Sequence, residues 1–227
     1  MYSSSIAAII SALRTLLSNR RSLLLMLVVY TGLLAAVYLF VSTREATVSQ
    51  LLLTLITVIV APVLFFVLQA ATVSYTNGPT SRGLIKNTLK LVVVSVPVIA
   101  LTLVAVSGLN KFQTHPTIVT TVRYTLLAVI VPLLVIQLWI AVSNSGIKSL
   151  RNVLPHAFAP QSMFVYACGF LIFAVAPYLL LQKTMPSPRP WLEMSLLVAR
   201  LALSALLILL GWVTTVGALS ILNARRT

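Results

Sequence analysis

The chain has 227 residues, of which 59% are hydrophobic and 8% are charged. Soluble domains carry about 25% charged residues, so this composition excludes a globular protein with a water-exposed surface. Sixteen Lys and Arg residues against two Asp and Glu give a net charge of +14, and these cations lie between long apolar runs. Because they form neither a basic tail nor an aromatic-rich platform, they indicate contact with anionic lipid and argue against nucleic acid.

The first element predicted along the chain is an amphipathic helix over residues 3–18. Its apolar positions recur at helical spacing opposite Ser11, Arg14, Thr15 and Ser18, a pattern typical of a helix that lies in the membrane interface. The apolar positions are Ile6, Ile9, Ile10, Leu13, Leu16 and Leu17.

Six longer apolar runs follow this helix. Each can cross a bilayer, because a crossing needs about 20 apolar residues at a rise of about 1.5 Å per residue. The predicted spans are residues 22–42, 48–75, 91–109, 124–143, 162–181 and 201–222. The sequence therefore predicts an all-α integral membrane protein with six transmembrane helices, in which residues 1–227 form a single polytopic membrane domain.

The Lys and Arg residues are divided unevenly between the two sides of this topology. The side of the termini holds Arg14, Arg20, Arg21, Arg82, Lys86, Lys90, Lys148, Arg151, Arg225 and Arg226. The opposite side holds Arg44, Lys111, Arg123, Lys183 and Arg189. Such a bias in short loops sets orientation, so we expect both termini in the cytoplasm. The cations of the first group are the predicted contacts with anionic lipid.

Short basic segments at residues 10–16, 83–89 and 146–154 each precede an odd-numbered predicted span. The second and fourth spans also share a proline, a glutamine and a Gly-containing turn, in that order. This pattern has two interpretations: three similar helical hairpins, or the common need of inner loops for cations and turns. Because each unit would begin on the same side, any repeat is parallel and not inverted.

Side chains that could carry chemistry are scarce, and no Asp, Glu or His lies in the middle of a predicted span. Ion-coupled carriers commonly use a buried carboxylate, and metal hydrolysis needs clusters of His, Asp or Glu. His115 and His156 belong to loops on opposite sides, and Cys168, within an apolar run, is expected to pack. The sequence thus predicts no catalytic residue, no metal site and no cofactor other than structural lipids.

The last apolar stretch runs from Trp191 to Leu222 and, as about 48 Å of helix, exceeds a single perpendicular crossing. If the span begins at Leu201, Arg200 lies at the outer interface and the residues before it form an extension. If the span begins near Trp191, Arg200 is deep in the membrane. It would then either extend its side chain outward to the interface or pair with Glu193 on the same helix face, and a deep position would mark an intramembrane site.

Small and amide side chains within the spans predict helix–helix contacts, because small residues let helices approach and amides form hydrogen bonds between them. These residues are Gly32, Ala36, Gln69, Gln137, Gly211, Thr215 and Ala218. Prolines inside four spans predict kinks, because each removes a backbone donor from the helix. They are Pro62, Pro97, Pro132 and Pro177.

The first hundred residues contain an amphipathic start that ends in Asn19-Arg20-Arg21. The second predicted span, residues 48–75, is followed by Gly78-Pro79-x-Ser81 and a basic helix. This layout resembles the poorly characterised six-span bacterial membrane proteins related to the membrane domain of some glycerophosphodiester phosphodiesterases. The resemblance implies a protein of the bacterial inner membrane with a lipid-linked or assembly role. It brings no catalytic residues to this chain.

Two functions from different classes fit these observations. The first is a non-catalytic membrane protein, an accessory subunit or assembly factor of a larger membrane complex, that contacts anionic lipids and partner subunits. The alternative is an uncoupled transporter, channel or lipid-moving protein for an anionic solute, which would use the kinked helices and a deep Arg200.

Overall fold

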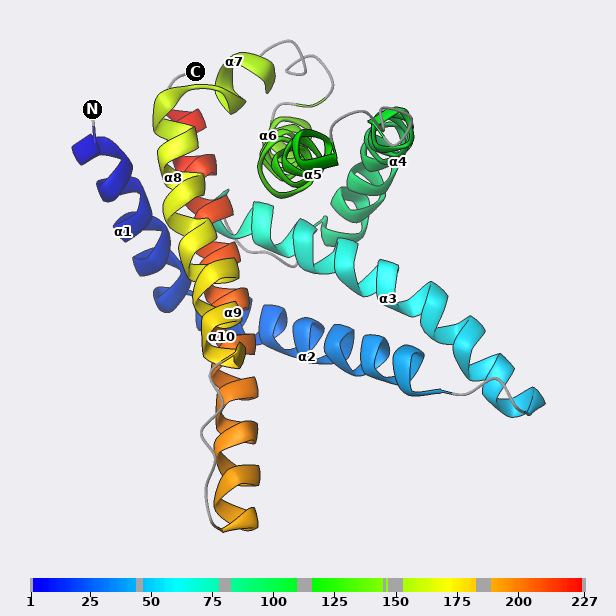
Figure 1. Ribbon diagram of the computed structural model, residues 1–227. Coiled ribbons are helices and arrows are strands. Elements are labelled where there is room, and N and C mark those ends of the chain that lie inside the picture. The colour runs from blue at the N-terminus through cyan, green and yellow to red at the C-terminus, as the bar shows by residue number, and fades with distance from the viewer. Residues whose placement is uncertain are drawn as a thin grey trace. The chain divides into compact units, whose positions relative to one another are not determined.

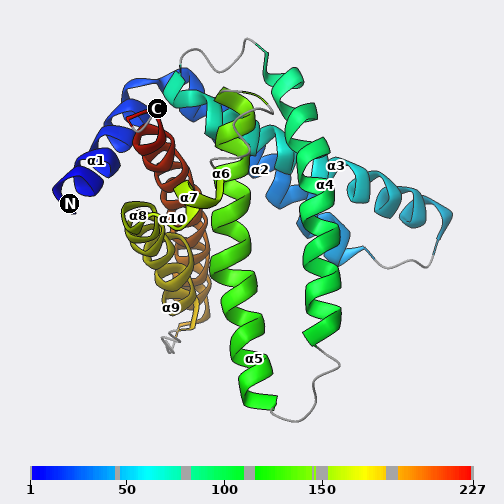
Figure 2. The ribbon, with the colours of Figure 1, turned by 90° about the horizontal axis from the view of Figure 1, so that it is seen from above.

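In the computed structural model, residues 2–43, 47–77, 83–109, 116–144, 146, 153–182 and 189–225 are described (Figures 1 and 2). They are almost entirely helical, and no strand occurs among them. Six segments within these residues are long and apolar enough to cross a membrane: Arg20–Ser42, Val48–Ser74, Leu84–Leu109, Thr117–Asn144, Pro160–Gln182 and Trp191–Ala224. Together with the short helix α1 (Tyr2–Ser18), they confirm the predicted all-α fold.

Several helices begin before the predicted spans, because backbone helicity continues where the apolar run stops. Helix α4 (Leu84–Leu109) includes most of the basic segment at residues 83–89, which precedes the predicted third span. It starts directly after Gly83, whose φ of 81° suits glycine. Helix α5 (Pro116–Thr125) and helix α10 (Pro190–Ala224) each begin at a proline, a residue favoured in the first turn.

Polar side chains mark two helix starts. Asn19 separates α1 from α2 (Arg20–Ser42), and its Oδ1 accepts a hydrogen bond from the backbone N–H of Ser22 at 3.2 Å. Thr47 precedes α3 (Val48–Ser74) and forms a capping box with Gln50, in which each side chain accepts from the other residue's backbone N–H. These caps fix where two of the membrane helices begin.

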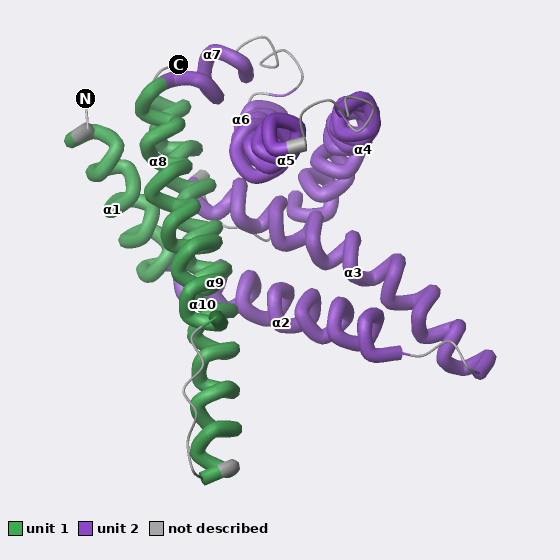
Figure 3. Tube along the Cα trace, viewed as in Figure 1, with its two compact units in different colours: residues 1–18, 160–227 green, residues 19–159 purple. Residues whose placement is uncertain are grey.

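The helices form two compact units (Figure 3). Unit 1 consists of residues 1–18 and 160–227, and unit 2 of residues 19–159. That both units belong to a single membrane domain stays a prediction.

Unit 2 contains two helix pairs, in which α2 packs on α3 and α4 packs on α6 (Val131–Asn144) (Figure 2). Between α5 and α6 lies the π-helical turn η2 (Leu126–Ile130), and the 3-10 turn η1 (Tyr75–Asn77) follows α3. The short helix α7 (Val153–Ala157) packs on α6. Most buried residues lie at the end of α3, the start of α4 and the end of α6. The core of unit 2 therefore sits at one end of its helices.

Unit 1 contains α1, α10 and the segment formed by α8 (Pro160–Phe170), the π-helical turn η4 (Leu171–Val175) and α9 (Ala176–Gln182). Helix α1 packs on α10 and α8, and Gln161 Nε2 of α8 donates to Ser4 Oγ at 3.3 Å. The last four turns of α10 are buried almost all around. The core of unit 1 therefore lies at the end of α10 that leads to the C-terminus.

Two glycines allow α10 and the α8–η4 segment to approach closely. A Cβ added to Gly169 would overlap the side chain of Thr215, with Cγ2 at 2.8 Å. A Cβ added to Gly211 would lie 2.9 Å from Ile172 Cγ2 and 3.1 Å from the backbone nitrogen of Phe173. Small residues at such crossings bring two backbones into van der Waals contact, which is the main attraction between helices in lipid.

Two of the four predicted proline kinks coincide with π-helical turns, which were not predicted. The N–H of Val131 donates to Leu126, and that of Ala176 donates to Leu171, five residues back in both cases. Pro132 and Pro177 follow these residues directly. Pro62 and Pro97 instead lie inside the α-helices α3 and α4. A π turn adds one residue to a helical turn. This extra residue changes which N–H groups bond to the carbonyls near a proline.

We expect Gly169→Ala and Gly211→Ala each to lower the free energy of unfolding by about 1–3 kcal/mol, because the added methyl overpacks a tight crossing. Thr215 cannot easily move aside, since its Oγ1 donates to the Gly211 carbonyl at 2.6 Å. Thermal unfolding in detergent measures the effect. Gly108→Ala is the matched control, because nothing lies within 4 Å of its Cβ position. Equal stability of all three variants would contradict this account of the crossing.

Candidate functional site

Helix α1 has two different apolar faces. Ser5, Ala8, Ala12 and Leu16, spaced three or four residues apart, are fully buried against the protein. Four further residues form an outward apolar stripe, which we call the α1 stripe. Its exposed fractions are 49% for Ile6, 55% for Ile10, 40% for Leu13 and 57% for Leu17.

The prediction that the six large apolar residues of α1 share one face is therefore wrong in part. Leu16 belongs to the face that packs on the protein. Arg14 lies one residue after Leu13 and is exposed. An exposed row of large apolar side chains with a cation beside it is the arrangement of helices that lie in the headgroup region of a bilayer. The geometry of α1 thus suits contact with both the protein and a lipid surface.

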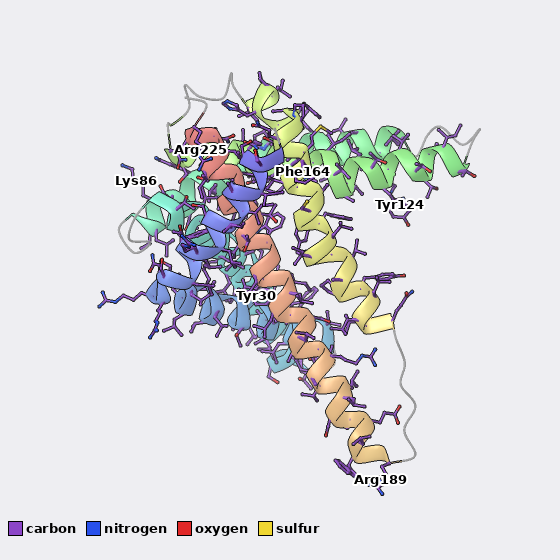
Figure 4. The ribbon with its side chains drawn as sticks, turned by 90° about the vertical axis from the view of Figure 1, so that its left-hand side faces the viewer. Tyr30, Lys86, Tyr124, Phe164, Arg189 and Arg225 are labelled. Carbon is purple, nitrogen blue, oxygen red and sulfur yellow. The ribbon has the colours of Figure 1, made fainter. Side chains whose placement is uncertain are left out.

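The other predicted lipid contacts are also at helix ends. Arg20, Arg21 and Lys86 are exposed, and Lys90 is half-exposed. Arg225 and Arg189 mark the two ends of α10, and Lys86 points away from its helix (Figure 4). The other four predicted contacts, Arg82, Lys148, Arg151 and Arg226, lie outside the described residues.

Arg200 does not form the pair with Glu193 that was one of the alternatives for a deep Arg200. Its Nε donates to the carbonyl oxygen of Leu180 at 2.9 Å and its Nη2 donates to that of Leu181 at 2.7 Å. Both carbonyls belong to the last turn of α9, where a helix lacks its own donors. A cation is also favoured at this end of a helix by the backbone dipole. Arg200 therefore caps α9 from the neighbouring helix.

The stretch before Arg200 is a continuation of α10. All nine residues from Trp191 to Ala199 are exposed, and they extend past the end of α9 (Figure 1). Ser195 Oγ donates to the Trp191 carbonyl at 2.9 Å. Glu193 is the acidic residue of the first turn of α10, where a carboxylate is favourable. These contacts give Arg200 and Glu193 separate roles at helix ends.

The predicted packing residues lie mostly inside their units. Thr215 and Ala218 are buried on α10, as are Gln69 on α3 and Gln137 on α6. Gly211 faces the η4 turn, as described above. On α2, Ala36 is buried, and the Cβ position of Gly32 lies 3.5 Å from Leu64 Cδ1 of α3. Gly169, the partner of Thr215, was not predicted.

Sequence reasoning also missed a polar junction in unit 2. The indole Nε1–H of Trp139 on α6 donates to Ser95 Oγ on α4 at 2.8 Å, and Ser95 donates to the Leu91 carbonyl at 2.7 Å. Phe65 of α3 contacts the Trp139 ring edge to face, with centroids 6.2 Å apart. A tryptophan inside an apolar run needs a partner for its N–H, and this requirement was the available signal.

The end of α3 is tied to the start of α4 by a second polar contact. Asn87 Nδ2 donates to Ser74 Oγ at 3.3 Å, and Ser74 donates to the Ala70 carbonyl at 2.7 Å. Tyr75, next in the chain, is 1% exposed.

Groups that could bind a metal or act as a nucleophile are dispersed. No group of three or more His, Cys, Asp or Glu occurs among the described residues. His156 lies in α7 and is half-exposed, Cys168 is half-buried on α8, and His115 lies outside the described residues.

We expect Ser95→Ala to reduce the free energy of unfolding by about 1–3 kcal/mol, because it leaves the buried indole N–H of Trp139 without an acceptor. In a cycle with Trp139→Phe, the coupling energy should be about 1 kcal/mol. Equilibrium unfolding in mixed micelles measures both values. The control is Thr102→Ala, whose hydroxyl donates only to the Val98 carbonyl of its own helix. A coupling energy of zero would show that the junction does not hold α4 to α6.

No protein-family model matches the chain. No curated protein and no solved structure matches it either. The function is therefore argued from the residues and their geometry.

Proposed function

We propose that this chain is a non-catalytic membrane protein that contacts anionic lipid through α1 and its basic helix ends. The observation that carries the proposal is the division of α1 into a buried face and the exposed α1 stripe beside Arg14. A helix that only completed the bundle would turn its large residues inward. Here Ser5, Ala8, Ala12 and a single large residue, Leu16, face the protein, and the four large residues of the α1 stripe face away.

The charge bias supports the same proposal. The cations on the side of the termini outnumber those on the opposite side by two to one, ten against five, as assigned above. The inner leaflet of the bacterial membrane carries anionic lipid, to which each nearby Lys or Arg adds about 1 kcal/mol of attraction. We infer an inner-membrane location with both termini in the cytoplasm, so that α1 lies on the cytoplasmic surface.

A role as accessory subunit or assembly factor is the second part of the proposal. In the most apolar windows of α2 and α4, 11% of the residues are buried. Most of the surface of these helices is thus open to lipid or to other transmembrane helices. Within a complex, such helices supply van der Waals contact area without bringing a charged group into the hydrocarbon. Extraction in mild detergent should yield an assembly larger than the chain, and a strictly monomeric product would argue against this part.

The transport alternative receives no support from Arg200. Two of its donor groups already point at the carbonyl oxygens of α9. An anionic solute would have to approach beside those oxygens, which repel it. We therefore keep lipid contact as the proposed function.

We expect the combined change Arg14→Gln, Arg20→Gln and Arg21→Gln to reduce the preference for anionic over zwitterionic lipid at least fivefold. The physical reason is the loss of three interfacial cations, each of which attracts an anionic surface. Native mass spectrometry of protein released from nanodiscs of mixed phosphatidylglycerol and phosphatidylcholine measures the retained lipid.

The charge-matched control is the combined change Lys111→Gln, Arg123→Gln and Arg189→Gln, which removes three cations from the opposite side. This variant should keep the lipid preference of the unaltered protein. If both triple variants lose the preference equally, net charge alone explains it and the assigned surface is wrong.

A further inference from the structure

The outer segment of the fifth membrane helix is weakly joined to the rest of that helix. Helix α9 follows the π turn η4, in which Ala176 N–H bonds to Leu171 five residues back. Pro177 comes next and has no N–H to donate, so the carbonyls around Phe173 lose a normal helical partner. Between Leu171 and Pro177 the backbone therefore makes fewer regular helical hydrogen bonds than an α-helix does.

Helix α9 packs on α10, and two specific contacts lie at the ends of the segment that η4 and α9 form. At the π turn, the backbone of Phe173 lies against Gly211, and the Phe173 ring contacts Trp212 edge to face at 5.3 Å between centroids. At the far end, the Arg200 guanidinium donates to the carbonyls of Leu180 and Leu181. The first contact lies at the weak point of the helix, and the second lies at its tip.

A buried hydroxyl lies on α10 between these two contacts. Arg200, Ser204 and Gly211 are four and seven residues apart, so they share one face of the helix, the face that α9 covers. Ser204 is 3% exposed, and its Oγ has no hydrogen-bond partner among the described residues. An unpaired buried hydroxyl is unfavourable and gains a partner when water reaches it. The closed arrangement therefore contains an unsatisfied polar group on this face of α10.

The fourth membrane helix provides an internal comparison. The π turn η2 starts six residues before Pro132, as η4 does before Pro177. Beyond η2, nearly all residues of α5 from Thr117 to Thr125 are exposed. Arg123 on α5 has no side-chain hydrogen bond to another described residue. The same π turn before a proline thus occurs twice, but α5 precedes η2 whereas α9 follows η4 and ends in free carbonyls that Arg200 binds.

We propose that α9 is a hinged segment, with the π turn Leu171–Val175 as its hinge and Arg200 as the latch that holds it on α10. When the guanidinium releases the two carbonyls, α9 swings away from α10 and uncovers the face that contains Ser204. Helix α10 keeps its position because its last turns remain packed against α1 and α8. Arg200 is a positioning residue in this device and its role is independent of the lipid contacts of α1.

The test uses the accessibility of a thiol placed under α9. Cys168 is the single cysteine of the chain, so Ser204→Cys in a Cys168→Ala background gives one reporter. With Arg200 present, the S204C thiol should react slowly with N-ethylmaleimide in detergent micelles. Adding Arg200→Gln should raise the rate at least tenfold, and Arg200→Lys should give an intermediate rate, because an ammonium cannot reproduce the two-pronged contact.

Two matched controls separate release of α9 from loss of the fold. Ala218→Cys in the same background places a thiol in the buried part of α10, where Ala218 is 0% exposed. This thiol should stay slow with Arg200→Gln. Arg123→Gln, which removes the exposed cation of α5, should leave the S204C rate unchanged. The proposal is overturned if Arg200→Gln leaves the S204C rate unchanged, or if the S204C and A218C thiols become reactive together.

Discussion

The fold depends on one constraint, which is that each backbone N–H and C=O within hydrocarbon must find its partner inside the protein. Unbroken helices meet this constraint by themselves. At the four prolines and at the end of α9, some backbone groups lack their regular helical partner. The protein compensates for this loss in two ways. The π turns before Pro132 and Pro177 shift the bonding pattern to a partner five residues back. At the end of α9, Arg200 supplies the donors.

Hydroxyl side chains follow the same constraint. Thr57, Thr72 and Ser95 are buried, and each donates to a carbonyl four residues earlier in its own helix. Such bonds satisfy a buried hydroxyl without a partner helix, so these residues add polarity at little cost. Ser95 goes further, because its oxygen also accepts from Trp139 on another helix. Ser5 and Ser204 have no such bond among the described residues, and Ser204 lies on the face of α10 that the hinge proposal concerns.

The number of membrane helices could be predicted from the sequence because length and hydropathy alone decide it. The starts of α4, α5 and α10 could not, since helix propensity and prolines extend a helix beyond its apolar run. Gly211 and Thr215 were predictable as small residues on one face of α10. Their partner Gly169 was not, because a single sequence does not say which helices meet.

Arg200 shows why the candidate site was harder to predict than the fold. Its spacing from Glu193 on one helix face suggested an ion pair, a local pattern that sequence displays directly. The structure instead gives Arg200 two backbone acceptors twenty and nineteen residues earlier in the chain. Backbone carbonyls carry no sequence signal, since each residue has one, and only the end of a helix leaves them unsatisfied. A charged residue in a membrane helix should therefore be compared with nearby helix ends as well as with opposite charges.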